Sequence, residues 1–257
     1  MKKTSVIIIG SGNAATFFAR NISARGMKIE CIISRNRETG SALAAKVSSR
    51  WESDFTALGS DENIIISTVK DSAAQEVWSK CPFGNRLVLH TAGSLPLSVL
   101  ANYAPNCGVL YPLQTLSKAR ELDSVKVPLL IEANTLENLE KLKKFASELS
   151  QSVTEVPSEK RAKLHLAAVF ANNFSNLCFR MAWELAEKEG LAPEMLLPLI
   201  EETCEKLRTL SPHAAQTGPA VRWDENVIGK HLQMLQETPE TAKFYELASC
   251  EIHRRAK

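Results

Sequence analysis

The feature that most restricts the fold of this chain is a glycine-rich turn near its start. A β-branched run, Ser5–Ile9, leads directly into the turn, and a stretch with helical character, Ala14–Ala24, follows it. In such a unit the first glycine permits a tight turn, the second lets the backbone approach a pyrophosphate, and a small sixth residue allows close helix–strand packing. The residues of this turn are Gly10, Ser11, Gly12, Asn13, Ala14 and Ala15.

The turn stands at the head of a repeated strand–helix pattern. Apolar runs at residues 28–33, 63–69, 87–90, 108–111, 127–131 and 151–156 are interleaved with helical stretches at 14–24, 39–46 and 135–149. Continuous apolar strands with helices between them predict a parallel sheet covered on both faces. We therefore predict a doubly wound Rossmann α/β domain over residues 1–156, whose first turn binds a dinucleotide phosphate at the helix N-terminus. The alternative for the turn is a plain strand-to-helix connection.

The sequence after residue 157 predicts helices only. The predicted helices span residues 158–188, 193–210, 224–236 and 239–252, with Thr238 as a capping residue and Pro239 in the first turn of the last helix. We predict an all-helical second domain over residues 157–257.

The end of the second strand indicates which dinucleotide is bound. An acidic residue about 20 residues beyond the motif usually selects NAD, and Glu30 stands near that distance. Glu30 lies inside the strand, however, and the strand ends at Ser34, followed by Arg35 and Arg37. A hydroxyl and two guanidinium groups suit a 2′-phosphate, so we predict NADP. The alternative is that the two arginines are solvated loop charges.

Two further loops follow strands at the edge where ligands of such sheets gather. We expect Val69 and Asp71, after the third long strand, and His90, Thr91 and Gly93, after the next, to approach the cofactor. Either loop could instead be an ordinary strand-to-helix connection.

Composition excludes several other classes. The 257 residues carry 31 basic and 29 acidic side chains, a balance that gives no footprint for nucleic acid. No apolar run approaches a membrane span, and the one after Lys2 and Lys3 is too short for a signal peptide. The six scattered cysteines are expected to be buried thiols of a cytoplasmic protein, with no metal site.

A polar stripe marks the long helix. At 100° per residue, Arg161, His165, Asn172 and Asn176 fall within about 60° of one another, and Asn173 lies beside them. Polar groups on a largely apolar helix need partners or a cavity. We predict His165, Asn172 and Asn173 as catalytic residues; the alternative is a solvent-facing stripe.

A second candidate block precedes a later helix. Thr217 and Gly218 stand where backbone N–H groups could hold a carboxylate, and Arg222 could add a bidentate contact. We predict these residues and Asp224 as substrate ligands. The alternative is a simple inter-helix turn with Asp224 as the N-cap.

Over nearly its whole length the chain resembles a family of bacterial Rossmann-like proteins whose helical C-terminal half is a domain of unknown function. The matching stretches are 10–15, 69–71, 90–93, 111–115, 160–161 with His165, 171–174, and 217–219 with Arg222 and Asp224. Members often have His in place of Tyr111 and Gly in place of Trp223. The family is similar to pyrroline-carboxylate reductase, ketopantoate reductase and the beta-hydroxyacid dehydrogenases.

The resemblance implies NADP-linked reduction of a small oxo acid or imino acid by a homodimer that pairs through its helical domains. The lysine-x-x-x-asparagine pair of several such enzymes is not found, since neither Lys160 nor Lys163 has an asparagine four residues on. We therefore expect His165 to donate the proton, Asn172 or Asn173 to hydrogen-bond the reacting oxygen, and the cleft between the domains to hold a carboxylate-bearing substrate such as ketopantoate. An imine reductase and a non-catalytic NADP sensor are the alternatives.

Overall fold

The computed structural model describes residues 5–56, 58 and 64–257; Asn63, the first residue of the predicted third apolar run, lies outside this part. The chain divides into two compact units, Met1–Asn173 and Phe174–Lys257. The predicted boundary after residue 156 stays a prediction. Among the described residues, no helix combines the length and the hydrophobicity needed to cross a bilayer.

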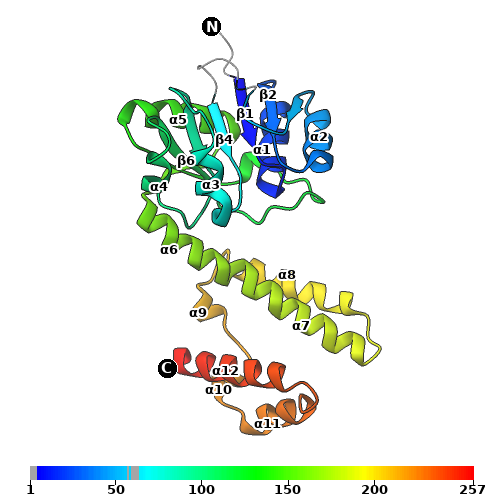
Figure 1. Cartoon of the computed structure of the whole chain (residues 1–257). Coiled ribbons are helices and arrows are strands. Elements are labelled where there is room, and N and C mark those ends of the chain that lie inside the picture. The colour runs from blue at the N-terminus through cyan, green and yellow to red at the C-terminus, as the bar shows by residue number, and fades with distance from the viewer. Residues whose placement is uncertain (1–4, 57, 59–63) are drawn as a thin grey trace. The chain divides into compact units, whose positions relative to one another are not determined.

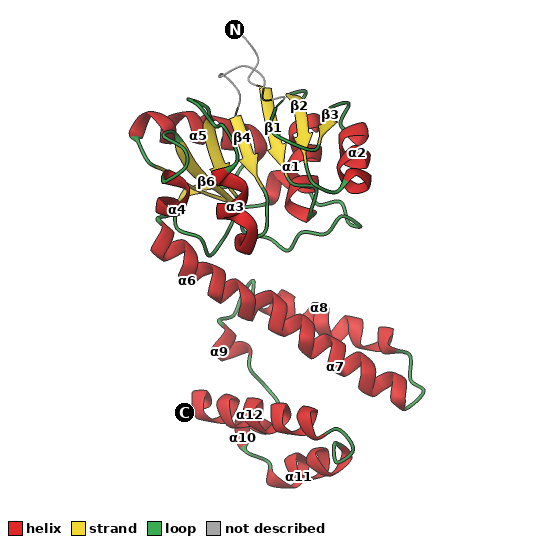
Figure 2. Cartoon of the chain, in the orientation of Figure 1, coloured by secondary structure: helices red, strands yellow, loops and turns green. Residues whose placement is uncertain are grey.

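The first unit is built on an eight-stranded sheet with the order β3-β2-β1-β4-β5-β6-β7-β8. Figures 1 and 2 show this sheet with helices beside it. All neighbouring strands are parallel except β6 and β7. The order reverses between β1 and β4, which is where doubly wound sheets bind ligands. The strands are β1 (Ser5–Ile9), β2 (Lys28–Ile33), β3 (Arg50–Glu52), β4 (Ile64–Ser67), β5 (Leu87–His90), β6 (Cys107–Pro112), β7 (Leu129–Ala133) and β8 (Val153–Glu155).

Helices cover both faces of the sheet, which confirms the predicted Rossmann fold. On one face, α1, α2 and α5 pack against alternate strand residues such as Val6 and Ile8; on the other, α3 and α4 pack against Ile7 and Ile9. Because both faces are buried, the strands are continuous apolar runs. These helices are α1 (Asn13–Ala24), α2 (Arg37–Lys46), α3 (Ala74–Ser79), α4 (Leu97–Ala101) and α5 (Leu136–Leu149).

The predicted long helix is interrupted. It consists of α6 (Ser158–Ala168), a π-helical turn (Val169–Phe174) and α7 (Ser175–Lys188). The π turn inserts extra residues into the helical repeat, so side chains on its two sides do not keep the 100° spacing on which the polar stripe was predicted. Such turns occur frequently at functional sites.

The second unit is all helical, as predicted. Its remaining helices are α8 (Leu197–Lys206), α9 (Pro212–Ala215), α10 (Pro219–Arg222), α11 (Glu225–Met234) and α12 (Pro239–Ala256). Within it, α12 packs against α10 and α11. Thr238 is the N-cap residue of α12 and Pro239 stands in its first turn, both as predicted. The Thr238 hydroxyl makes no capping hydrogen bond and donates to the Leu235 carbonyl instead.

The cysteine prediction is correct for the first unit only. Cys31, Cys81 and Cys107 are buried thiols, whereas the three in the helical unit, Cys178, Cys204 and Cys250, are exposed. Burial raises the pKa of Cys31 and Cys107 to about 11 and that of Cys81 to about 12, so these thiols stay protonated. They act as small apolar side chains of the sheet core.

Candidate active site

The glycine turn has the geometry that its sequence predicts. Gly10 has φ +119°, in the region that favours glycine, and a Cβ there would collide with Oγ1 of Thr68. That hydroxyl donates to the carbonyl of Ile9 and holds the turn against the end of β4. A Cβ on Gly12 would meet no described atom within 4 Å, so the surface outside it is open. The turn thus leaves room for a group that comes close to the backbone.

The N-terminus of α1 opens at this turn. Gly12 is its N-cap residue and has no side chain that could accept from the first N–H groups of the helix. Ala15 is buried, as the close helix–strand packing requires. The Ser11 hydroxyl shares a 2.7 Å hydrogen bond with the Thr39 hydroxyl of α2. Free N–H groups, a helix dipole and open space together fit a pyrophosphate.

The end of β2 fits a 2′-phosphate through its arginines more than through its serine. Glu30 lies inside β2 and pairs with Arg50 at 3.8 Å, so it is engaged away from the strand end. The Ser34 hydroxyl is buried, donates to the Asn36 carbonyl, and accepts from the indole N–H of Trp51.

Two exposed guanidinium groups remain beside Ser34. Arg35 and Arg37 are both exposed, and the guanidinium of Arg37 lies 5.9 Å from the centre of the Trp51 ring. Asn36 caps α2 by accepting from the Thr39 N–H, which is why α2 begins at Arg37, two residues before the predicted start. The two arginines can therefore contact a phosphate without breaking any contact of the Ser34 hydroxyl.

The loops after β4 and β5 are joined to each other. The Ser94 hydroxyl donates to the Asp71 carboxylate, and the Thr91 hydroxyl lies 3.5 Å from the Ser67 carbonyl. Val69 packs partly buried against the sheet core. These contacts fix both loops at the carboxyl edge of the parallel strands, next to Gly10. Their predicted contacts with a cofactor stay predictions.

The side chain of His90 is buried at the end of β5. Its Nδ1 accepts from the Ala92 N–H at 3.2 Å, and its Nε2 has no partner among the described residues. Burial, and secondarily the nearby charge of Arg161, lowers the pKa of His90 to about 3. The ring is therefore neutral and shapes the loop after β5.

The same edge carries His165, which α6 brings against β6. Nδ1 of His165 lies 3.0 Å from the hydroxyl of Tyr111, and the two rings meet edge to face at 5.8 Å. A Cβ on Gly93 would lie 2.6 Å from the same Nδ1, so only glycine lets the loop after β5 come this close. His165 is half-buried, and its Nε2 makes no hydrogen bond to a described residue.

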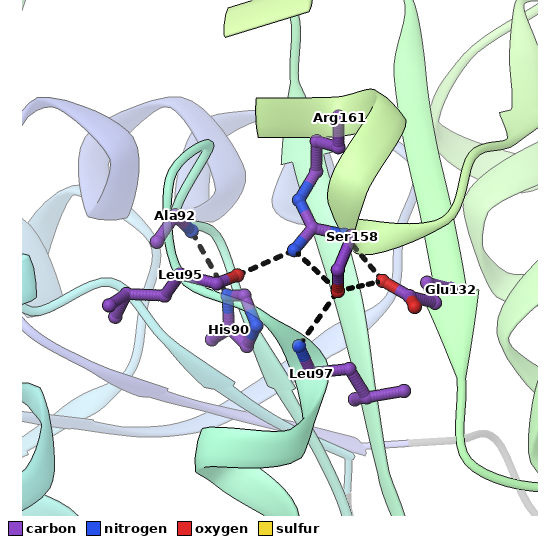
Figure 3. A network of polar contacts seen from close by, with 7 residues as sticks. All are labelled: His90, Ala92, Leu95, Leu97, Glu132, Ser158 and Arg161. Carbon is purple, nitrogen blue, oxygen red and sulfur yellow. Dashed lines mark hydrogen bonds and ion pairs between the residues drawn. The ribbon is translucent and has the colours of Figure 1, made fainter. Parts of the chain in front are cut away.

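A buried network fixes the first turn of α6 to the sheet (Figure 3). Arg161 is fully buried and pairs with Glu132 of β7 at 2.6 Å, while its other terminal nitrogen donates to the Leu95 carbonyl at 2.5 Å. Ser158 donates to the same carboxylate and accepts from the Leu97 N–H. Because His165 stands one helical turn after Arg161, this network sets the position of the imidazole.

Asn172 and Asn173 lie in the π turn, and both are exposed. Arg161, by contrast, faces the interior, so the alternative of one solvent-facing stripe is wrong. The structure brings Tyr111, Gly93 and His165 together; it shows no such contact for the two asparagines, whose catalytic role stays a prediction.

The predicted substrate ligands all belong to the second unit. Thr217 and Arg222 are exposed, and Gly218 has φ +109° just before α10. Asp224 is the N-cap of α11, because its carboxylate accepts from the Val227 N–H at 3.2 Å. The alternative given for Asp224 is thus the observed arrangement, and a role of this block in binding a carboxylate stays a prediction.

Trp223 adopts a backbone conformation that favours glycine. Its φ of 53° and ψ of 53° are left-handed, a conformation that glycine adopts without steric cost. The indole lies beside the His253 ring, with the ring centres 5.1 Å apart and the planes tilted by 40°. Glycine at this position would therefore satisfy the same backbone.

Comparisons with known proteins agree with this geometry. Residues 5–92 match the family described as NADP oxidoreductase, coenzyme F420-dependent, and residues 127–252 match a domain of unknown function, DUF2520. The solved structure of BF3122 from Bacteroides fragilis, named as an NADP oxidoreductase, is 42% identical over 98% of each chain, with a TM-score of 0.93. This chain belongs to the same NADP oxidoreductase family. No curated protein matches it.

Two reductases share the fold at low identity. A pyrroline-5-carboxylate reductase from Coxiella burnetii is 17% identical, with a TM-score of 0.61 over 99% of this chain and 98% of its own. An imine reductase from Myxococcus stipitatus, solved with NADP⁺, is 13% identical, with a TM-score of 0.64 over 97% and 92% of the two chains. The family assignment confirms the predicted oxidoreductase class.

Two residues of the site, Tyr111 and Glu132, were given no role by sequence reasoning. Tyr111 appeared only within a matching stretch, and Glu132 was not singled out. A signal existed for Glu132, since it is a lone carboxylate following the apolar run of β7. A carboxylate at such a place needs a partner, and the fully buried Arg161 supplies it.

Proposed function

We propose that this chain is an NADPH-dependent reductase of a small oxo acid. One observation carries the proposal: the open glycine turn at Gly10–Ala15 and the half-buried His165 lie at the same carboxyl edge of one sheet. A dinucleotide site and a proton donor at one sheet edge are what a carbonyl reductase requires.

The residues of the first unit fit the cofactor. The α1 N-terminus would hold the pyrophosphate, and Arg35 and Arg37 would hold the 2′-phosphate. When bound, NADPH supplies a hydride with its electron pair to the carbonyl carbon. Selection of NADPH over NADH then depends on the arginines, because Glu30 is paired inside the strand.

His165 supplies the proton. Reduction of the carbonyl carbon would move the π electron pair of the C=O bond onto oxygen, and the His165 imidazolium would donate its Nε2 proton there. The electrons of the broken N–H bond stay on Nε2 of the ring, and the product is a hydroxy acid. With Nδ1 engaged by Tyr111, Nε2 is the nitrogen left for this transfer.

The choice of an oxo acid rests on the carboxylate ligands predicted from the sequence, Arg222 and the N–H groups near Gly218. Asn172 or Asn173 would hydrogen-bond the reacting oxygen. The test follows NADPH absorbance with the purified protein and a panel of oxo acids and cyclic imines, ketopantoate first. The proposal expects turnover with an oxo acid, faster with NADPH than with NADH.

The same panel separates the rivals. Turnover with cyclic imines alone would replace the oxo-acid proposal with an imine reductase, the activity that the names of two fold neighbours suggest for those proteins. Tight NADPH binding with no turnover of any compound would indicate a non-catalytic sensor.

We further propose that a second copy covers the helical unit. Helices α7 and α8 contain no buried residue among those described, and large apolar side chains on both are exposed. Soluble monomers rarely expose apolar surface on this scale. Light scattering during gel filtration should give the mass of a dimer; a monomer at micromolar concentration would refute the proposal. The exposed apolar residues are Leu177, Phe179, Leu185, Leu197 and Leu199.

A further inference from the structure

The contact between Tyr111 and His165 is one of two tyrosine–histidine pairs among the described residues. The other joins Tyr245 of α12 to Nδ1 of His231 of α11 at 2.8 Å. Both pairs meet edge to face, with ring centres 5.8 Å and 5.6 Å apart. They differ in place: the first stands at the sheet edge, and the second lies in the helical unit.

Tyr111 is held more rigidly than an ordinary surface tyrosine. It is 9% exposed and pairs with Leu130 across the β6–β7 ladder, so the backbone on both sides is fixed by the sheet. Its ring packs with Val109 and Leu130. A phenol oxygen fixed in this way can define where the imidazole of His165 rests.

We propose that Tyr111 is a positioning residue: its hydroxyl holds Nδ1 of His165, so that Nε2 becomes the nitrogen that transfers the proton. The inference rests on the proposed role of His165 as proton donor. In the imidazolium, Nδ1–H donates to the phenol oxygen and Nε2–H faces the substrate. After transfer, the neutral ring keeps the Nδ1 proton on the same partner, so the tautomer is set before and after the step.

Two further features support this assignment. Gly93 closes the space on the side of Nδ1, because even a methyl group there would come within 2.6 Å of that atom. Burial raises the pKa of Tyr111, and the charge of Arg161 only partly opposes this, so the residue stays a neutral phenol whose oxygen can accept from Nδ1–H of His165.

The kinetic test compares two matched variants. Tyr111→Phe removes only the hydroxyl at the sheet edge, and Tyr245→Phe removes the equivalent hydroxyl from the second pair. With an oxo acid that the wild type reduces, Tyr111→Phe should lower kcat about tenfold to a hundredfold and leave the KM for NADPH unchanged. Tyr245→Phe should keep the wild-type kcat. Equal kcat values for wild type and Tyr111→Phe would overturn the proposal.

The second arm needs no substrate and so fails independently of the proposed function. Nitrogen-15 NMR of the folded protein reports which ring nitrogen of His165 carries the proton. Wild type should show a single tautomer, and Tyr111→Phe the tautomer mixture of a free imidazole; circular dichroism confirms that the variant is folded. A His165 that already exchanges between tautomers in the wild type overturns the inference, even if Tyr111→Phe does not fold.

Discussion

Gly93 offers a direct test of the packing at the sheet edge. In a Gly93→Ala variant the new Cβ would lie 2.6 Å from Nδ1 and 2.7 Å from Cγ of His165, and 3.1 Å from Cε2 of Tyr111. Carbon contacts are comfortable at about 3.5–4.0 Å, so the imidazole must retreat by about 1 Å. The backbone of Gly93 is not in the left-handed region, so the clash alone carries the effect.

The retreat has two costs. Overpacking of this kind typically costs about 1–3 kcal/mol, and losing the 3.0 Å hydrogen bond between Tyr111 and His165 adds about 0.5–1.5 kcal/mol. We expect the free energy of unfolding to fall by about 1.5–4.5 kcal/mol in total. If His165 is the proton donor, a displacement of about 1 Å should also reduce kcat about a hundredfold.

Urea unfolding of the purified variants measures the first effect. The matched control is Gly229→Ala, because Gly229 lies in α11 and a Cβ there would meet no described atom within 4 Å. That control should be as stable as wild type or more stable by up to about 1 kcal/mol. If Gly93→Ala unfolds like the control and keeps the His165 tautomer of the wild type, the close approach of loop, tyrosine and histidine is refuted.

Three further predictions concern other parts of the chain. The pKa of His90 is about 3 in the folded chain, against an ordinary histidine value of 6.5, so the unfolded chain binds a proton first as pH falls. Between pH 7 and pH 5 the free energy of unfolding should therefore fall by about 2 kcal/mol more in wild type than in His90→Asn. Equal losses in urea melts of the two proteins would refute this. Trp223→Gly should be more stable than Trp223→Ala by about 1 kcal/mol, because only glycine adopts φ 53° without strain, and thermal melts that rank alanine first would contradict this. Arg37→Ala should weaken NADPH binding at least about tenfold in fluorescence titrations and leave NADH binding unchanged, whereas equal losses for both would argue against a 2′-phosphate contact.

The fold was predictable because its signals are local and repeated. Apolar runs such as Ser5–Ile9 and the glycine pattern that follows depend on residues adjacent in the chain, and both faces of the sheet are buried, so the runs are unbroken. The position of Arg35 and Arg37 was predictable for the same reason, because both follow the end of β2 closely in the chain. Local sequence also indicated the helix-capping position of Asp224, which had been given as the alternative to a substrate ligand.

The site was less predictable because it depends on long-range pairing. Tyr111 and His165 are 54 residues apart, and Arg161 and Glu132 are 29 apart, so no local pattern joins them. The predicted stripe also assumed a uniform helix, which the π turn at Val169–Phe174 breaks. Sequence reasoning therefore singled out His165 but not the Tyr111 hydroxyl that contacts it.

The central claim is that His165 donates the proton in NADPH-dependent reduction at this edge of the sheet. Stopped-flow single-turnover measurement of hydride transfer, with an oxo acid that the wild type reduces, tests it most directly. His165→Ala should bind NADPH like wild type and transfer hydride at least about a hundredfold more slowly. An unchanged rate of hydride transfer in this variant would remove His165 from the mechanism and contradict the account.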